Sequence, residues 1–281
     1  MSSIVILGAG ELGGALARQL ACADVARRIV LVDESANLAE GKALDIRQAA
    51  PIDGYSTVVT GSSDESTVVG ADFIVIADRA ATGAEWHGDT GVALVRRVAY
   101  LNPNAVILCA GAAHMDLVER GVGEGGLDRH RLFGSAPEGL RSAVAAMTAL
   151  EVGCSATEIS VAVVGRPPGE IIVPWDEASI GGRRAIDVLS PPAIVRLEAR
   201  LPRLWPPGPL TLASAAARVI VSATRWQHEA VCIFVALSRE ESAARPTGVL
   251  PAYVSDTGIS QLLTPTLSTR DRVRLDTALR R

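Results

Sequence analysis

A glycine-rich turn near the amino terminus most constrains the fold of this chain. A short apolar run, residues 4–7, leads into Gly8, Gly10 and Gly13, which have the spacing G-x-G-x-x-G, and a helical apolar pattern follows at once. A second apolar run ends in Asp33. The order of strand, glycine turn, helix, strand and acid is typical of a dinucleotide-binding βαβ unit. It predicts a parallel sheet that binds a dinucleotide.

Each residue type in this turn has an expected task. The first glycine permits the bend, the second lets the backbone approach a pyrophosphate, and the third lets helix and strand pack closely. The start of the helix presents free N–H groups to the phosphates. A carboxylate after the second strand accepts ribose hydroxyls and would repel a 2′-phosphate, so we expect NAD rather than NADP. The predicted cofactor-binding residues are Gly8, Gly10, Glu11, Leu12, Gly13 and Asp33.

Strand-like and helix-like segments alternate through the first half of the chain. We expect strands at 3–8, 28–33, 56–60, 72–77, 105–110 and 130–134, with helices or turns at 11–25, 36–48, 64–70 and 88–101. This alternation predicts an α/β fold of the Rossmann type, with a doubly wound parallel sheet.

The pattern of strand-like and helix-like segments changes near residue 135. Helical patterns are expected at 138–150, from 191, at 213–223 and from 269, with strands at 159–165, 230–237 and 250–254. We therefore predict a dinucleotide-binding domain at 1–135 and an α+β substrate-type domain at 136–281.

Composition narrows the class of protein. The chain is 48% hydrophobic and 21% charged, with a net charge of −4, which indicates a globular protein without the basic surface that nucleic acid or anionic membrane requires. The four cysteines show no metal-binding spacing and are expected to be reduced, buried thiols. A strand-like run begins within three residues of the start, and no apolar run is long enough to span a membrane, so we expect a cytoplasmic protein.

Beyond the glycine turn, the chain resembles the malate/lactate dehydrogenase family, in particular the lactate dehydrogenase-like malate dehydrogenases of bacteria. The similar segments are 38–51, 72–77, 100–108, 131–141, 163–174 and 258–263. The resemblance implies a Rossmann domain followed by a substrate domain, and hydride transfer between NAD and a 2-hydroxy acid. It also implies a small acidic metabolite as ligand, and a homodimer or homotetramer with the helix at 38–51 as a contact.

The resemblance implies five catalytic side chains, most of which this chain has replaced. Pro168 stands where the family has its proton-transferring histidine, and a proline ring has no titratable proton. Glu138 stands at the aspartate that orients this histidine, and Arg141 at the arginine that grips the substrate carboxylate. Trp86 stands at the arginine of a mobile loop, although Arg79 is an alternative counterpart.

Gly111 and Ala112 replace the family's Asn-Pro after the fifth strand. Among substitutes for the missing base, His87 belongs to the loop that would close over the nicotinamide, whereas surface or packing roles are expected for the other histidines, His114, His130 and His228. Glu170 is expected to be an exposed loop residue.

Arg141 has two readings: it binds an acidic ligand, together with Arg166, or it pairs with Glu138 one helical turn away. Three functions therefore stay open. The chain is an oxidoreductase with a rebuilt active site, a catalytically silent NAD-binding sensor, regulatory or assembly protein, or a purely structural homo-oligomer.

Overall fold

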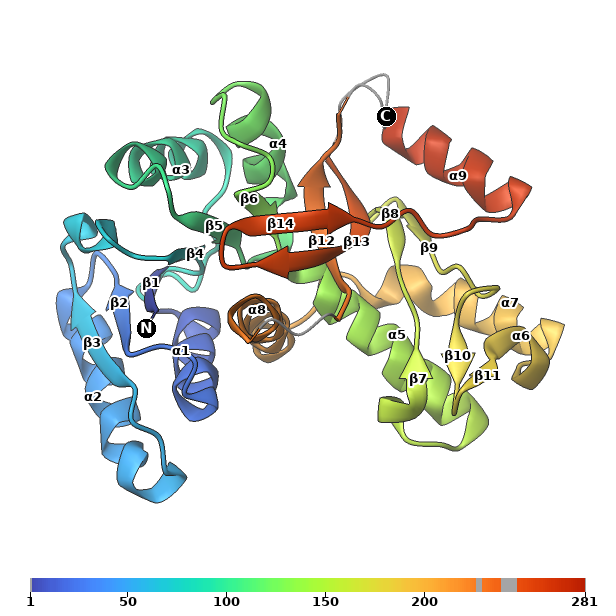
Figure 1. Ribbon diagram of the computed structural model, residues 1–281, viewed down its shortest axis with the longest axis horizontal. Helices are drawn as coiled ribbons and strands as arrows, with labels where there is room; N and C mark the ends of the chain where they lie inside the picture. The colour runs from blue at the N-terminus through green and yellow to red at the C-terminus, as the bar shows by residue number, and fades with distance from the viewer. Residues whose placement is uncertain (1, 226–228, 239–246, 281) are drawn as a thin grey trace.

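The computed structural model describes residues 2–225, 229–238 and 247–280. Its centre is a mixed sheet that runs through both halves of the molecule (Figure 1). Six parallel strands form the amino-terminal part in the order β3-β2-β1-β4-β5-β6. These strands are β1 (Ser3–Leu7), β2 (Arg28–Val32), β3 (Val58–Ser62), β4 (Phe73–Ile76), β5 (Val106–Cys109) and β6 (Leu132–Gly134).

The strand order confirms the predicted doubly wound Rossmann sheet. The four residues of β4 and the four of β5 are all buried, as the near-continuous apolar runs of a sheet covered on both faces require. The order reverses between β1 and β4, so the carboxyl ends of these two strands flank the crevice where such sheets bind ligands.

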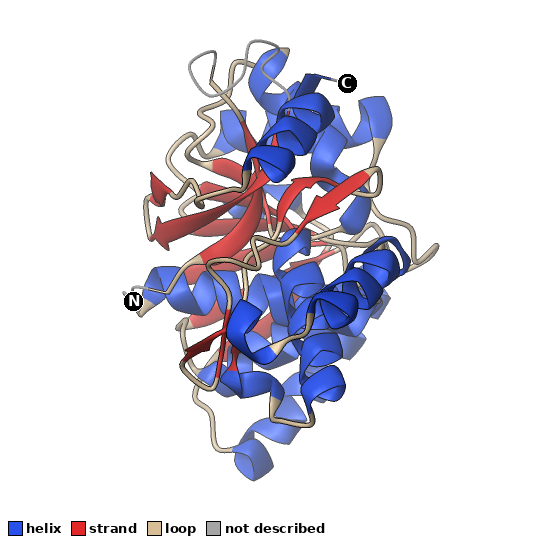
Figure 2. Ribbon diagram, turned by 90° about the vertical axis from the view of Figure 1, so that its right-hand side faces the viewer, coloured by secondary structure: helices blue, strands red, loops and turns tan. Residues whose placement is uncertain are grey.

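Helices cover both faces of the sheet (Figure 2). The helices of the first half are α1 (Glu11–Ala23), α2 (Ala36–Asp53), α3 (Gly88–Leu101) and α4 (Met115–Gly123), with short 3-10 turns η1 (Glu65–Val68) and η2 (Ala112–His114). Helix α4 was not predicted, because it is short and directly continues η2.

The carboxyl-terminal half continues the same sheet with antiparallel strands. Strand β12 pairs with β6 through Phe234 and Gly134, so the sheet and the hydrophobic core run through residue 135. The domain boundary near that residue stays a prediction. The added strands are β12 (Val231–Ala236), β13 (Thr247–Ser255), β14 (Gly258–Leu262), β8 (Val164–Arg166) and β9 (Glu170–Ile172).

The expected strand at 159–165 is divided, because only its two ends pair with other strands. Its start is β7 (Ile159–Ser160), which joins β10 (Ser179–Ile180) and β11 (Arg183–Arg184) in a small separate sheet, and its end belongs to β8. The helices of this half are α5 (Ala136–Val152), α6 (Ala185–Val188), α7 (Pro191–Arg200), α8 (Pro209–Thr224) and α9 (Thr269–Arg280), with η3 (Ala156–Glu158) and η4 (Leu201–Leu204).

Helix α8 lies against α1 and joins the two halves (Figure 1). The start of α8 and the proline-rich segment before it therefore reach the carboxyl edge of the parallel sheet, beside the glycine turn.

The cysteines are free, as expected, but only Cys109 and Cys232 are buried. Cys22 is exposed and Cys154 is half-buried, which corrects the prediction that all four are in the core. The polar side of α1 faces solvent at Cys22, whereas Cys109 and Cys232 lie on central strands.

Candidate functional site

A cleft of about 810 Å³ lies between the glycine turn and the start of α8. The glycine turn and the segment after β4 supply one wall, and the proline-rich segment 205–209 supplies another. Its ionisable lining residues, among those the structure describes, are Glu11, Lys42, Asp78 and Glu85. The cleft has the expected position for a dinucleotide-binding protein, but its charge is mainly acidic.

Asp78 is the residue that organises this cleft. It follows β4, is 4% exposed, and directs its carboxylate at the first turn of α1. Oδ2 accepts a hydrogen bond from the Leu12 N–H at 3.1 Å, and Oδ1 accepts one from the Gly13 N–H at 2.9 Å. The carboxylate therefore satisfies two of the N–H groups that a helix start leaves free for an anion.

The glycines of the turn fit this carboxylate closely. A Cβ on Gly10 would lie 2.3 Å from Cγ of Asp78, and one on Gly8 would lie 2.4 Å from the Asp78 carbonyl oxygen. Gly8 also has φ of +112°, which favours glycine. The third glycine has its expected packing role, because a Cβ on Gly13 would lie 2.0 Å from the Gly8 carbonyl oxygen.

Glu85 makes a similar contact on the opposite side of the cleft. Its carboxylate accepts hydrogen bonds from the N–H groups of Ala112, at 3.0 Å, and Ala113, at 2.7 Å, at the start of η2. Residues 78 and 85 also form an isolated antiparallel bridge. The segment expected to be a mobile lid is thus attached both to the start of α1 and to the start of η2.

Asp33 is buried at the end of β2, as the sequence predicts, but its carboxylate is already engaged. Oδ2 accepts from the N–H groups of Ala9 and Ala80, and Oδ1 accepts from the N–H of Ser35. The carboxylate therefore joins the glycine turn, the segment after β4 and its own strand end.

The crevice beside Asp33 is nearly filled. Only about 40 Å³ of space is left there, and Arg79 and Trp86 line it together with the ends of β1 and β2. The Arg79 guanidinium carbon lies 4.9 Å from the centroid of the Trp86 ring, within cation–π range. Neither residue reaches the large cleft, so the structure places both proposed counterparts of the loop arginine elsewhere.

Arg141 and Glu138, the predicted substrate arginine and its neighbouring carboxylate, form a bidentate ion pair on α5. Nε of Arg141 lies 2.8 Å from Oε2 of Glu138, and Nη2 contacts Oε1. Glu138 is buried, accepts from the Cys232 N–H at 2.9 Å, and also forms an ion pair with Arg218, whose Nε lies 3.0 Å from Oε1. This arrangement matches the structural reading of Arg141.

Burial by itself would lower the pKa of Arg141, but the hydrogen bond and charge of Glu138 raise it, so the guanidinium stays charged. Arg141 lines a second cavity of about 480 Å³ and is not among the described residues of the large cleft. Arg141 therefore lies at a cavity separate from the large cleft, on a face of α5 that packs against β12, and ligand binding by Arg141 stays a prediction.

Pro168 lies in the turn between β8 and β9, at a third cavity of about 540 Å³ beside α9. Arg166 donates to the Thr247 carbonyl and pairs with Glu119 at 2.8 Å, and Glu170 pairs with Arg274 of α9. Arg141 and Arg166 therefore do not share a ligand site. Glu170 is half-buried and paired, which corrects the expectation of an exposed loop residue.

The histidines do not supply a base to the cleft in the part of the chain that is described. His87 is exposed and begins α3, with Nδ1 3.1 Å from the Glu85 carbonyl oxygen. His114 is fully buried, where its Nδ1 accepts from the Gly111 N–H at 2.9 Å, and burial lowers its pKa to about 3. His228 lies outside the described residues.

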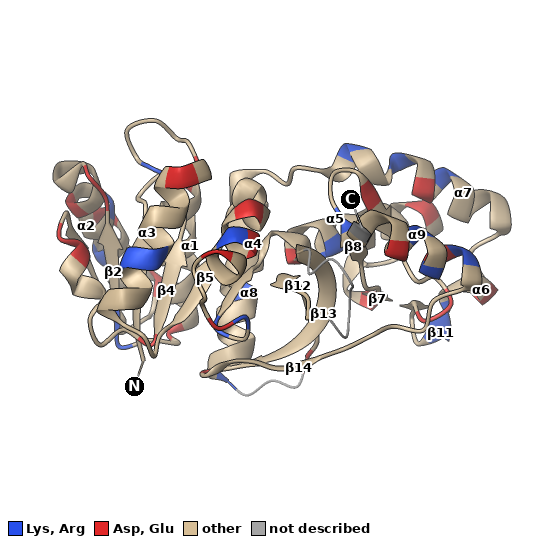
Figure 3. Ribbon diagram, turned by 90° about the horizontal axis from the view of Figure 1, so that it is seen from above, with Lys and Arg blue, Asp and Glu red and all other residues tan. Residues whose placement is uncertain are grey.

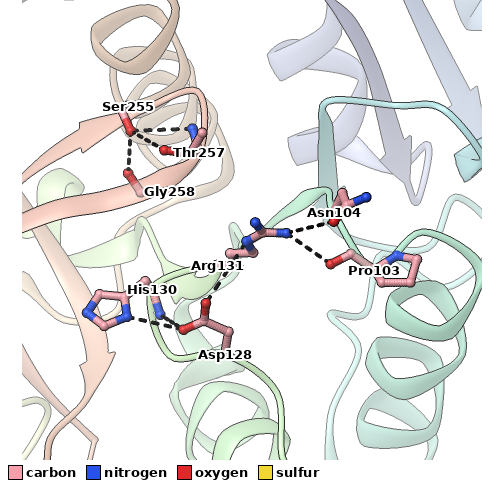
Figure 4. Close-up of polar contacts among 8 residues, drawn as sticks. All are labelled: Pro103, Asn104, Asp128, His130, Arg131, Ser255, Thr257 and Gly258. Atoms are coloured by element: carbon pink, nitrogen blue, oxygen red, sulfur yellow. Dashed lines mark hydrogen bonds and ion pairs between the residues drawn. The ribbon is translucent and has the colours of Figure 1, made fainter.

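His130 stands at the start of β6, at the amino edge of the parallel sheet, opposite the cleft. Figure 4 shows its ring beside Asp128, with Nδ1 3.1 Å from Oδ1, while Arg131 extends to Pro103 and Asn104. The His130 carbonyl also accepts from the Ile259 N–H of β14. His130 therefore has the structural role that the sequence predicts for it.

Asp78, Glu85 and Lys42 line the cleft although no sequence pattern singled them out. Lys42 is the only lysine of the chain, and its Nζ donates to the Gly10 carbonyl at 2.6 Å. The position of Asp78 could have been inferred from the sequence. Asp78 directly follows a predicted strand whose carboxyl end must border the crevice, and an acidic residue at that point faces the start of the helix. The proline-rich segment gave no signal for its place at the cleft.

Acidic and basic positions alternate on α4 and α9 (Figure 3). Within the described ranges, no group of His, Cys, Asp and Glu has the arrangement of a metal site, and no helix has the length and apolarity needed to cross a bilayer.

Strand order, glycine turn and cleft together define an α/β protein with the fold of dinucleotide-binding proteins. Residues 2–108 match the family described as lactate/malate dehydrogenase, NAD binding domain. The malate dehydrogenase of Thioalkalivibrio sulfidiphilus is 28% identical over 296 residues, covering 99% of this chain and 96% of that protein. That of Thermomicrobium roseum is 31% identical over 179 residues, covering 61% and 57%.

Solved structures agree on the fold. The lactate dehydrogenase of Cryptosporidium parvum complexed with lactic acid and NAD has a TM-score of 0.85 at 18% identity, covering 99% of this chain and 95% of that one. The malate dehydrogenase of Salinibacter ruber has a TM-score of 0.84 at 18% identity, covering 98% and 93%. The family match therefore covers the first 108 residues, and the whole chain has the fold of the malate and lactate dehydrogenases.

The predicted cofactor, NAD, is confirmed by the match of residues 2–108 to an NAD-binding domain. Two parts of the groove that would hold this dinucleotide are, however, occupied by side chains of the chain itself. The N–H groups of the α1 start hold the Asp78 carboxylate, and the crevice beside Asp33 holds Arg79 and Trp86.

Proposed function

We propose that this chain is a malate/lactate dehydrogenase homologue that no longer interconverts 2-hydroxy and 2-oxo acids, and that it acts instead by binding, as a sensor, regulatory or assembly protein. One observation supports this most directly. The described lining of the cleft carries three carboxylates and one ammonium group, with neither histidine nor arginine.

The proposed loss of turnover follows from what the reaction needs. A base that loses and regains a proton near neutral pH contributes about 10²–10⁴-fold to rate, and Pro168 provides none. A substrate carboxylate needs a guanidinium partner, and Arg141 is already paired with Glu138. An anionic 2-oxo acid would also meet the negative charges of Asp78 and Glu85.

A binding role does not by itself identify the assembly partner. We propose that the partner is a second copy of this chain. Helix α2 exposes large apolar side chains at Leu38, Leu44 and Ile52, the last 87% exposed. The family resemblance implies this helix as a contact of a homodimer or homotetramer. Apolar side chains gathered on one exposed helix are typical of surfaces that pack against another chain.

The test follows NADH absorbance at 340 nm with oxaloacetate and with pyruvate, using an active malate dehydrogenase as the positive control. We expect a rate at least about 10⁴-fold below that control, from the loss of one acid/base group and of substrate orientation. Turnover within tenfold of the control would favour the rebuilt oxidoreductase instead. Sedimentation velocity on the same samples measures the assembly state.

A further inference from the structure

We infer that this chain fills its own dinucleotide groove and that a dinucleotide binds only after residues 78–86, here called the latch, move away. The Asp78 carboxylate takes the position of the pyrophosphate at the start of α1, and Arg79 and Trp86 fill the crevice beside Asp33. This inference goes beyond the loss of turnover and does not depend on it.

The first support is competition for the same donors. A pyrophosphate at a βαβ turn is held by the free N–H groups at the helix start. Here the N–H groups of Leu12 and Gly13 donate to Asp78 at 3.1 and 2.9 Å. A carboxylate and a phosphate are both anions that accept such bonds, so the two exclude each other from these donors.

The second support is space. The glycine at the second position of the motif is there so that an anion can come close to the backbone. In this chain the side chain of Asp78 uses that space, because a Cβ on Gly10 would lie 2.3 Å from its Cγ and 2.3 Å from its Oδ2. A phosphate placed against Gly10 would overlap the Asp78 side chain.

The third support is the crevice at the end of β2, where an adenosine would lie next to Asp33. About 40 Å³ of space is left there, whereas small-molecule sites usually offer about 300–1,000 Å³. Arg79 and Trp86, which both belong to the latch, line this space and stack on each other. One movement of the latch would therefore clear both parts of the groove.

The latch is also attached at both ends as one unit. Its interior is closed by backbone hydrogen bonds from Arg79 N–H to the Ala84 carbonyl and from Gly83 N–H to the Arg79 carbonyl. Asp78 holds it to α1, and Glu85 holds it to the start of η2. Two carboxylates from one short segment thus cap two helix starts that face the cleft.

The test compares NADH dissociation constants, measured by isothermal titration calorimetry, for the wild-type chain, Asp78→Ala and Asp72→Ala. Asp72 precedes the same strand β4 at its amino end and accepts from the Ser3 N–H, so its removal changes the net charge equally and leaves the groove untouched. We expect Asp78→Ala to bind NADH at least about tenfold more tightly than wild type, since the internal competitor is gone. Asp72→Ala should stay within about twofold of wild type.

Equal affinities of Asp78→Ala and wild type, including no measurable binding by either, would overturn the inference. If Asp78→Ala does not fold, Asp78→Asn serves, because it keeps the side-chain size and one acceptor but removes the charge; about threefold tighter binding is expected. Hydrogen exchange on the wild-type chain is the second measurement. Millimolar NADH should speed exchange in 78–86, and binding that leaves exchange there unchanged would also overturn it. Neither readout requires turnover.

Discussion

Replacing Glu138 by glutamine tests whether the Glu138–Arg141 pair stabilises the fold or serves a reaction. The side chain of Glu138 is 2% exposed and that of Arg141 is 16% exposed. The carboxylate accepts two hydrogen bonds from Arg141 and one from the Cys232 N–H, and it forms an ion pair with Arg218. In the variant one oxygen becomes an NH₂ group that faces a guanidinium N–H, and the half-buried positive charge of Arg141 loses its partner.

Breaking a buried ion pair by removing one partner costs about 3–5 kcal/mol of unfolding free energy, because the other charge stays buried and uncompensated. For a chain of this size we expect Glu138→Gln to lower Tm by about 6–10 °C. Urea denaturation followed by circular dichroism measures the free energy, and calorimetry measures Tm.

Glu151→Gln is the matched control. Glu151 is also on α5 and pairs with Arg196, whose side chain is 59% exposed. Such surface pairs contribute at most about 1 kcal/mol, so this variant should stay close to wild type. A loss below about 1 kcal/mol for Glu138→Gln would refute the structural role and reopen the binding role of Arg141.

Two further predictions concern buried titratable groups. Burial lowers the pKa of His114 to about 3 from an ordinary 6.5, so below pH 6.5 the unfolded chain takes up a proton that the folded chain does not. As the pH falls from 6 to 4, this group should lower the free energy of unfolding by about 1.4 kcal/mol per pH unit. His114→Asn should therefore flatten the slope of unfolding free energy against pH in that range. An unchanged slope in the variant would contradict the prediction. Burial also raises the pKa of the Cys109 and Cys232 thiols to about 12. A thiol reagent at pH 8 should therefore spare both in the folded chain and label them only in denaturant; labelling of either without denaturant would contradict this.

The sequence predicted the parallel sheet well because its signals are local. Continuous apolar runs such as those of β4 and β5 identify buried strands, and a glycine turn followed by a helix fixes the first βαβ unit. The split of 159–165 into β7 and β8 depends on which distant strands pair with each end, and no local pattern contains that information.

The candidate site was less predictable because it depends on where side chains point. The sequence places Arg141 and Glu138 one helical turn apart, which is compatible both with a ligand site and with an ion pair. The direction of that face of α5, toward Cys232 and away from the cleft, is set by tertiary packing. Asp78 and Glu85 reach the cleft only because the segment between them turns back on itself.

The glycine motif therefore indicates the backbone conformation of the turn and does not identify the group bound there. A helix start buried at the edge of a sheet leaves N–H groups that need an acceptor whether or not a nucleotide is present. In this chain a carboxylate from the neighbouring strand end is that acceptor, and Gly8 and Gly10 are needed as much for its close approach as they would be for a phosphate. Substituting either glycine by alanine would disturb the folded chain itself. The fold would thus require the glycine motif even in a chain that no longer binds the cofactor. For this reason cofactor affinity has to be measured with Asp78 variants and not inferred from the glycines.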